Sequence, residues 1–134
     1  MDLYARGWAP KDKPKAVVAL IHGLGEHTGR YAHVGAALTE KGYALLGFDL
    51  RGHGKSGGPR GHLPSSEAFM TDIDRFLEET AERYPGLPQF LYGHSLGGLL
   101  VLNYALRRKP RLAGVISPLV PGCALRSKSR RSKW

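Results

Sequence analysis

The segment 93–98 places a serine where it could act as a nucleophile. It reads Gly-His-Ser-Leu-Gly-Gly and follows the apolar run 90–92. A G-x-S-x-G pattern between a strand and a helix holds its serine at the tip of a sharp turn, with the hydroxyl exposed. We expect Gly93 and Gly97 to flank Ser95 because side chains there would collide with the neighbouring strand and helix. The pattern predicts covalent attack by Ser95 on an acyl carbon.

The same turn supplies one half of an oxyanion site. Attack on an acyl carbon builds negative charge on the acyl oxygen, and a backbone N–H in the first turn of a helix can stabilise that charge. Leu96 directly follows Ser95 and opens the expected helix 96–108. We therefore predict that the backbone N–H of Leu96 is an oxyanion donor.

Two further motifs follow expected strands. The apolar run 16–21 is followed by His-Gly-Leu-Gly-Glu-His at 22–27. The apolar run 43–48 is followed by Asp-Leu-Arg-Gly-His-Gly-Lys-Ser at 49–56. Continuous apolar runs of this length are typical of strands buried on both faces of a parallel sheet. The three motifs are therefore expected in loops that leave neighbouring strands.

Together these motifs, with Arg30-Tyr31 after the first of them, resemble the monoacylglycerol lipase and lysophospholipase branch of the α/β-hydrolases. That branch is similar to the serine aminopeptidase-like hydrolases. The resemblance runs from about Leu3 to about Pro118. It implies an α/β-hydrolase fold and a serine ester hydrolase that cleaves carboxylic esters of lipids through an acyl-enzyme.

The resemblance also implies roles for single residues. Hydrolases of this kind take their second oxyanion donor from the turn after an early strand, which assigns that role to the backbone N–H of Leu24. His22, Gly23 and His94 are expected to shape the site, and His22 is expected to brace the oxyanion loop rather than to take a proton. Glu26 and His27 are expected to shape the same turn.

The residues after Ser95 include no Asp, no Glu and no His. The family's triad runs Ser, then Asp or Glu, then His along the chain. Without a histidine base the hydroxyl of Ser95 stays protonated and is a poor nucleophile. We therefore expect the chain to be a truncated, N-terminal half of an enzyme that is inactive or weak by itself. An α/β-hydrolase-like binding module without catalysis is the alternative.

His53 is the candidate for a substitute base, because its loop follows a strand next to the serine strand. The favoured interpretation is that His53 and Asp49 order their own loop by hydrogen bonds. His94 adjoins Ser95 on the chain, so its side chain is expected to point away from the serine hydroxyl.

Charge is distributed unevenly. The net charge is +9, yet all 11 acidic residues precede Ser95 while basic residues continue to Lys133. The segment 126–134 is basic, lacks periodicity and is expected to be a disordered tail without a specific function. A basic tail can bind RNA or anionic lipid, so a nucleic-acid-binding protein is a further alternative interpretation. We expect a hydrolase part over 1–122 and a tail over 123–134.

Composition limits the remaining classes. Hydrophobic residues make up 42% of the chain, and Cys123 is the single cysteine, so no disulfide framework is expected. No metal and no cofactor are expected. No secretory signal or membrane-spanning stretch is apparent, and a cytoplasmic location with peripheral membrane contact is expected. The expected partner is a lipid ester rather than a specific nucleic acid.

The expected elements alternate between strand and helix. Strands are expected near 3–8, 16–21, 43–48, 89–92 and 113–117, and helices near 30–41, 65–83 and 96–108. Gly42 should end the first helix, and Ser65 or Ser66 should cap the second. This alternation predicts a mainly parallel sheet of about five strands with helices on both faces.

Overall fold

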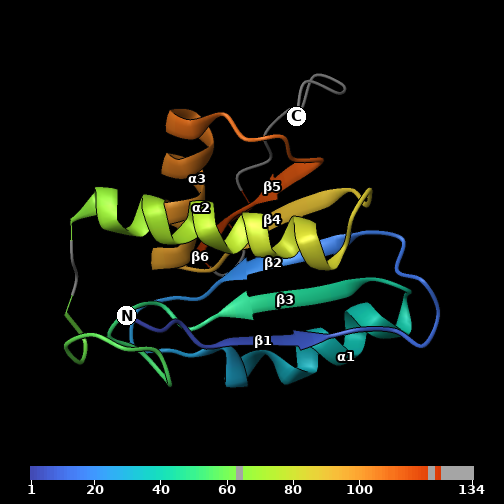
Figure 1. Ribbon diagram of the computed structural model, residues 1–134, viewed down its shortest axis with the longest axis horizontal. Coiled ribbons are helices and arrows are strands. Elements are labelled where there is room, and N and C mark those ends of the chain that lie inside the picture. The colour runs from blue at the N-terminus through green and yellow to red at the C-terminus, as the bar shows by residue number, and fades with distance from the viewer. Residues whose placement is uncertain (63–64, 121–122, 125–134) are drawn as a thin grey trace.

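Five strands form one sheet in the order β1-β3-β2-β4-β5 (Figure 1). The computed structural model describes residues 1–62, 65–120 and 123–124. The strands are β1 (Ala5–Trp8), β2 (Val17–Ile21), β3 (Ala44–Phe48), β4 (Gln89–Gly93) and β5 (Gly114–Ile116). The helices are the 3₁₀ helix η1 (Thr28–Tyr31), α1 (Ala32–Glu40), α2 (Ser66–Arg83) and α3 (Leu96–Arg108).

The sheet is mainly parallel, as the sequence predicts. Strand β2 pairs in parallel with both β3 and β4, and β4 pairs in parallel with β5. Only the edge strand β1 runs antiparallel, with Ala5 opposite Phe48. The strand that precedes Ser95 is therefore next to the edge of this sheet.

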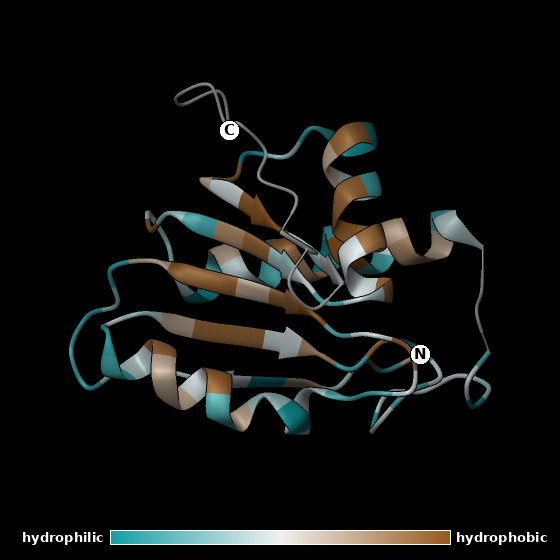
Figure 2. Cartoon of the chain, turned by 180° about the vertical axis from the view of Figure 1, so that it is seen from behind, coloured by the Kyte–Doolittle hydropathy of each residue, from teal (hydrophilic) through white to brown (hydrophobic). Residues whose placement is uncertain are grey.

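Helices cover both faces of the sheet, and each face has its own apolar core (Figure 1). On one face, alternate residues of β2 and β3 pack against α2 and α3, and the rings of Phe48 and Phe76 lie 4.8 Å apart. On the other face, Leu20 and Leu45 pack with Val34 and Leu38 of α1. Much of β2 and β3 is accordingly coloured as hydrophobic in Figure 2. The α/β-hydrolase fold class predicted from the sequence is confirmed.

The predicted helix ends are confirmed where a capping residue marks them. The hydroxyl of Ser65 accepts a hydrogen bond from the backbone N–H of Ala68 at 3.3 Å. Gly42 adopts φ +89° just after α1, a backbone conformation that glycine enters without steric cost. The helix expected near 30–41 differs at its start, because the chain first forms the 3₁₀ turn η1.

The end of the described chain differs from expectation. Strand β5 covers only Gly114–Ile116, and a small antiparallel pair follows it, formed by β6 (Pro118–Val120) and β7 (Cys123–Ala124). Cys123 and Ala124 fall within the tail predicted over 123–134. The rest of that predicted tail, residues 125–134, lies outside the described residues.

Basic side chains at the end of α3 link it to α2. Arg108 forms ion pairs with Glu67 at 2.6 Å and with Asp74 at 3.4 Å, and the hydroxyl of Tyr104 donates to Asp74 at 2.6 Å. These contacts fix the helix that begins beside Ser95 against its neighbour. No helix in the described part of the chain has both the length and the apolar character needed to cross a membrane.

Candidate active site

Ser95 lies in a strained turn between β4 and α3. Its φ of +56° and ψ of −116° are rare for a residue with a side chain. Such a conformation costs on the order of 1–3 kcal/mol and persists only where the surroundings impose it. Ser95 is exposed, so the turn presents its hydroxyl to solvent. The predicted geometry of this turn is confirmed.

The glycines around Ser95 are required by close packing. A β-carbon on Gly93 would collide with the carbonyl group of Gly97, and one on Gly97 would collide with the carbonyl oxygens of Ile21 and His22. The first turn of α3 therefore packs directly against the backbone at the end of β2. The predicted steric requirement for both glycines is confirmed.

Gly23 brings the loop after β2 into contact with the Ser95 turn. A β-carbon on Gly23 would lie 3.1 Å from the carbonyl oxygen of His94 and 3.2 Å from the β-carbon of Ser95. Leu24 follows immediately, so its backbone N–H is one peptide unit from this contact. Within the described residues, the backbone N–H groups of Leu24 and Leu96 donate no hydrogen bond to a turn, cap or side chain. Both remain available to a ligand oxygen.

His22 is fully buried and braces the loop. Its Nε2 accepts a hydrogen bond from the backbone N–H of Leu50 at 2.9 Å, so the proton resides on Nδ1, which donates to the carbonyl of Gly23 at 2.7 Å. Burial lowers the pKa of His22 and favours this neutral form. Both ring nitrogens are thus engaged, which agrees with the expected bracing role.

Glu26 also stabilises the loop after β2 through hydrogen bonds of its carboxylate. Its Oε2 accepts from the backbone N–H of Gly23 at 2.8 Å and from the hydroxyl of Tyr31 at 2.7 Å. Its Oε1 lies 3.5 Å from Nδ1 of His94. His27 caps η1, where its Nδ1 accepts from the backbone N–H of Gly29 at 3.1 Å. Glu26 and His27 therefore shape the turn, as expected.

Asp49 orders the loop that follows β3. One of its oxygens accepts from both the backbone N–H and the hydroxyl of Thr28 at 2.7 Å, and the other accepts from the backbone N–H of Lys55 at 2.9 Å. Burial tends to raise the pKa of Asp49, but these hydrogen bonds outweigh it and lower the pKa below its usual range. The carboxylate is therefore a structural anion that ties the loop to η1.

His53 lies in this loop, which leaves β3. The expectation that its strand lies next to the serine strand is wrong, because β2 lies between β3 and β4. Nδ1 of His53 lies 3.1 Å from the carbonyl oxygen of Arg51, and its ring centre is 5.4 Å from that of His22. Its Nε2 is buried and has no hydrogen-bond partner in the described chain. No hydrogen bond joins His53 to Ser95 among the described residues. The geometry agrees with the interpretation that Asp49 and His53 order their own loop.

An open hollow of about 400 Å³ lies between the loop after β2 and the glycine-rich loop after β3. Its lining combines one apolar side chain with polar and glycine residues: Leu24, Gly25, Glu26, His27, Gly52, His53, Gly54, Arg60 and Gly61. The guanidinium of Arg60 donates to backbone carbonyls of its own loop, including that of Gly54 at 2.8 Å. The hollow reaches Leu24 and therefore adjoins the predicted oxyanion position.

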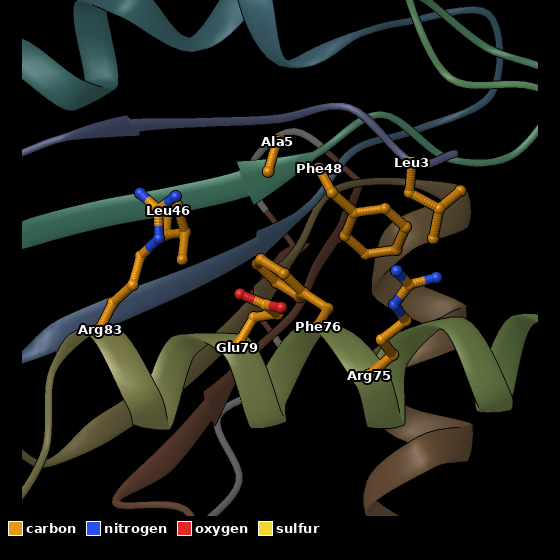
Figure 3. Close-up of a pocket in the computed structure, with 8 residues that line it drawn as sticks. All are labelled: Leu3, Ala5, Leu46, Phe48, Arg75, Phe76, Glu79 and Arg83. Atoms are coloured by element: carbon orange, nitrogen blue, oxygen red, sulfur yellow. The ribbon is translucent and has the colours of Figure 1, made fainter. Parts of the chain in front are cut away.

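A second hollow, of about 230 Å³, lies under α2 beside the edge strand β1 (Figure 3). Its walls are apolar residues of the N-terminal segment, the sheet and α2, and three charged side chains of α2 reach toward the strands. The lining residues are Leu3, Ala5, Leu46, Phe48, Arg75, Phe76, Glu79 and Arg83. None of these residues belongs to the three sequence motifs, so this hollow is separate from the Ser95 site.

The sequence pattern of one protein family matches most of the chain. The serine aminopeptidase family, S33, matches residues 12–130, which includes all three motifs and extends beyond the expected limit near Pro118. The chain belongs to the serine aminopeptidase family. It is therefore a member of a hydrolase family, with the α/β-hydrolase fold described above.

Several known relatives of this family member are lipases. The chain is 38% identical over 120 residues to monoglyceride lipase of Homo sapiens, which covers 88% of the chain and 40% of that enzyme. It is 50% identical over 121 residues to an abhydrolase domain-containing protein of Dictyostelium discoideum, covering 88% of the chain and 13% of that protein. Among solved structures, monoacylglycerol lipase of Paleococcus ferrophilus matches with a TM-score of 0.72 and 44% identity, covering 86% of the chain and 42% of that enzyme. The chain thus spans less than half the length of each.

Two contacts that hold the site were not predicted from the sequence. Tyr31 was named only as part of the Arg30-Tyr31 motif, and no contact was predicted for it. Its hydroxyl donates a hydrogen bond to Glu26. Arg51 donates two hydrogen bonds of 2.7 Å to the carboxylate of Asp72 in α2. An acidic residue on the inner face of an amphipathic helix was the one available signal for the second contact. Across the described residues, no cluster of three side chains suited to hold a metal ion is present.

Proposed function

We propose that this chain provides the nucleophile and the oxyanion site of a serine hydrolase that cleaves carboxylic esters of monoacyl lipids. The observation that carries the proposal is the strained, exposed turn at Ser95 in contact with Gly23 of the neighbouring loop. The relatives named monoglyceride lipase and monoacylglycerol lipase favour a monoacylglycerol over other esters.

In the proposed reaction, Oγ of Ser95 attacks the acyl carbon of the ester and its proton passes to a base. The backbone N–H groups of Leu24 and Leu96 stabilise the oxyanion. The bond to the alcohol oxygen then breaks, the alcohol leaves with a proton, and an acyl-enzyme forms on Ser95. Water hydrolyses the acyl-enzyme, which releases the fatty acid and restores the serine.

The 134 residues hold no Asp, Glu or His after Ser95. We infer that the acid and the histidine of a complete triad are not among them, and that the chain as given turns over esters weakly or not at all. Loss of one triad member leaves a residual acceleration of about 10³–10⁴ over water in well-formed sites. A binding module that holds a monoacyl lipid without cleaving it is the second candidate, because no base is hydrogen-bonded to Ser95 among the described residues.

Labelling with a fluorophosphonate probe tests the proposal. We expect slow labelling of the wild-type chain and none of Ser95→Ala, together with weak hydrolysis of p-nitrophenyl butyrate. Equal labelling of the two proteins would contradict the assignment of Ser95. Binding of a non-hydrolysable monoacylglycerol ether by a chain that is never labelled would favour the binding module.

A further inference from the structure

Glu26 lies where three parts of the candidate site meet. One carboxylate oxygen accepts hydrogen bonds from the loop after β2, through Gly23 N–H at 2.8 Å, and from η1, through the Tyr31 hydroxyl at 2.7 Å. The other oxygen lies 3.5 Å from Nδ1 of His94, the residue before the candidate nucleophile. A single side chain thus links the oxyanion loop, η1 and the turn after β4.

We propose that Glu26 is a positioning residue whose carboxylate holds the oxyanion loop so that the backbone N–H of Leu24 is directed at the space beside Ser95. The proposal rests on the proposed function, because an oxyanion donor matters only where Ser95 attacks an acyl carbon. Glu26 acts through the backbone of its own loop.

The hydrogen bonds around Gly23 determine where the Leu24 amide points. The carbonyl of Gly23 accepts from Nδ1 of His22 at 2.7 Å and from the backbone N–H of Glu26 at 3.3 Å. A trans peptide unit is planar, with its C=O and N–H directed oppositely. The N–H of Leu24 therefore points away from the two donors that hold the Gly23 carbonyl. The carboxylate of Glu26 fixes the preceding peptide unit through the N–H of Gly23.

Apart from the packing of Gly23 against the Ser95 turn, few other contacts among the described residues hold this loop. The side chain of Leu24 is 56% exposed and contributes little packing. Gly25, the next residue, has φ +71° and open space around its α-carbon. Glycines on both sides of Leu24 give the free loop more backbone freedom than other residues would. The anchoring hydrogen bonds are therefore what selects one direction for the Leu24 amide.

The charge on Glu26 strengthens this anchor. Burial tends to raise its pKa, but the hydrogen bonds from Tyr31 and Gly23 outweigh burial and lower it. Burial, and then the hydrogen bond to Glu26, raises the pKa of Tyr31, which stays a donor. Hydrogen bonds to an ionised acceptor are roughly twice as strong as neutral ones. The other titratable groups that act on this carboxylate are His22, Tyr92 and His94.

Amide NMR of the full 134-residue chain tests the proposal independently of catalysis. In the wild type, we expect the Gly23 amide resonance to move as Glu26 titrates, with a midpoint below the ordinary glutamate pKa. In Glu26→Gln that titration should vanish, the Leu24 resonance should shift, and hydrogen exchange at Gly23 should quicken about tenfold. Glu82→Gln, at an exposed site on α2, is the matched control and should leave both amides unchanged.

Tyr31→Phe gives a second variant in case Glu26→Gln does not fold. It removes one hydrogen bond and keeps the carboxylate, so the midpoint of the Gly23 titration should rise toward the ordinary value. Unchanged Gly23 and Leu24 resonances in a folded Glu26→Gln protein, or an unshifted midpoint in Tyr31→Phe, would overturn the proposal.

Fluorophosphonate labelling separates positioning from stability. We expect Glu26→Gln to lower the maximal labelling rate of Ser95 about tenfold, with unchanged probe affinity, once the rate is normalised to the folded fraction. A loss of probe affinity with the maximal rate preserved would count against a positioning role. Should the wild-type chain never label, the proposed function fails, while the NMR result still decides whether Glu26 holds the loop.

Discussion

Gly97 and Ile21 are in direct backbone contact, because no β-carbon fits between the α-carbon of Gly97 and the carbonyl oxygen of Ile21. The contact joins the first turn of α3 to the end of β2. It sets the distance between Ser95, which precedes that turn, and the oxyanion loop that leaves β2.

Gly97→Ala should therefore destabilise the fold and separate the two halves of the site. We expect a loss of about 2–3 kcal/mol in the free energy of unfolding, because the obstructing atoms are backbone and cannot rotate away. Urea unfolding measures this loss. Gly86→Ala is the control: Gly86 has φ +77° but open space around it, so it should lose only about 1 kcal/mol. Equal losses would contradict the steric explanation.

The ion pair between Arg51 and Asp72 should contribute measurably to stability. Both hydrogen bonds are 2.7 Å long, and the Asp72 side chain is only 8% exposed. Removing either partner leaves the other charge incompletely solvated. In a double-mutant cycle of Arg51→Ala and Asp72→Ala, we expect a coupling energy of about 1–3 kcal/mol.

The pair of Arg107 and Glu67 is the matched control for that cycle. Arg107 and Glu67 join α3 to α2, whereas Arg51 and Asp72 join a loop to α2. The nitrogen–oxygen distance of the Arg107 pair is 3.4 Å, and both side chains are about half exposed. We expect a coupling energy below about 0.5 kcal/mol. A coupling energy for the Arg51 pair no larger than this would show that burial and bidentate geometry add nothing here.

The sequence predicted those features that depend on local patterns. Apolar runs identified the sheet strands, and the steric demand of G-x-S-x-G identified the turn at Ser95. The contact of Arg51 with Asp72, 21 positions away, depends on where α2 packs on the sheet. No local pattern encodes that packing, so neither this pair nor the short pair β6–β7 was predicted. The 3₁₀ turn before α1 was not predicted either; the hydroxyl of its Tyr31 donates to Glu26, five positions earlier in the chain.

Acid should weaken the fold through Asp49. Its pKa in the folded chain is lower than in an unfolded chain, where it is about 3.9. The unfolded state therefore binds more protons at low pH, so the stabilisation is present above about pH 4 and is lost as pH falls through the lowered pKa. Asp49→Asn should lower stability at pH 7 and flatten the decline between about pH 5 and pH 2. Urea unfolding across that pH range measures both effects. If the free energy of unfolding of Asp49→Asn falls as steeply with pH as that of the wild type, carboxylates other than Asp49 cause the loss of stability in acid.

His53 should not act as a base for Ser95. Its Nε2, the ring nitrogen left free by the contact of Nδ1 with Arg51, is buried and has no hydrogen-bond partner among the described residues, and its loop is held in place by Asp49. A general base needs hydrogen-bond reach to the serine hydroxyl. We expect His53→Ala to label with a fluorophosphonate as fast as the wild type, once the rate is normalised to the folded fraction, whereas Ser95→Ala does not label. Ester turnover that is robust in the wild type and lost in both variants would instead establish His53 as a substitute base, and the 134 residues would then contain a working serine–histidine pair.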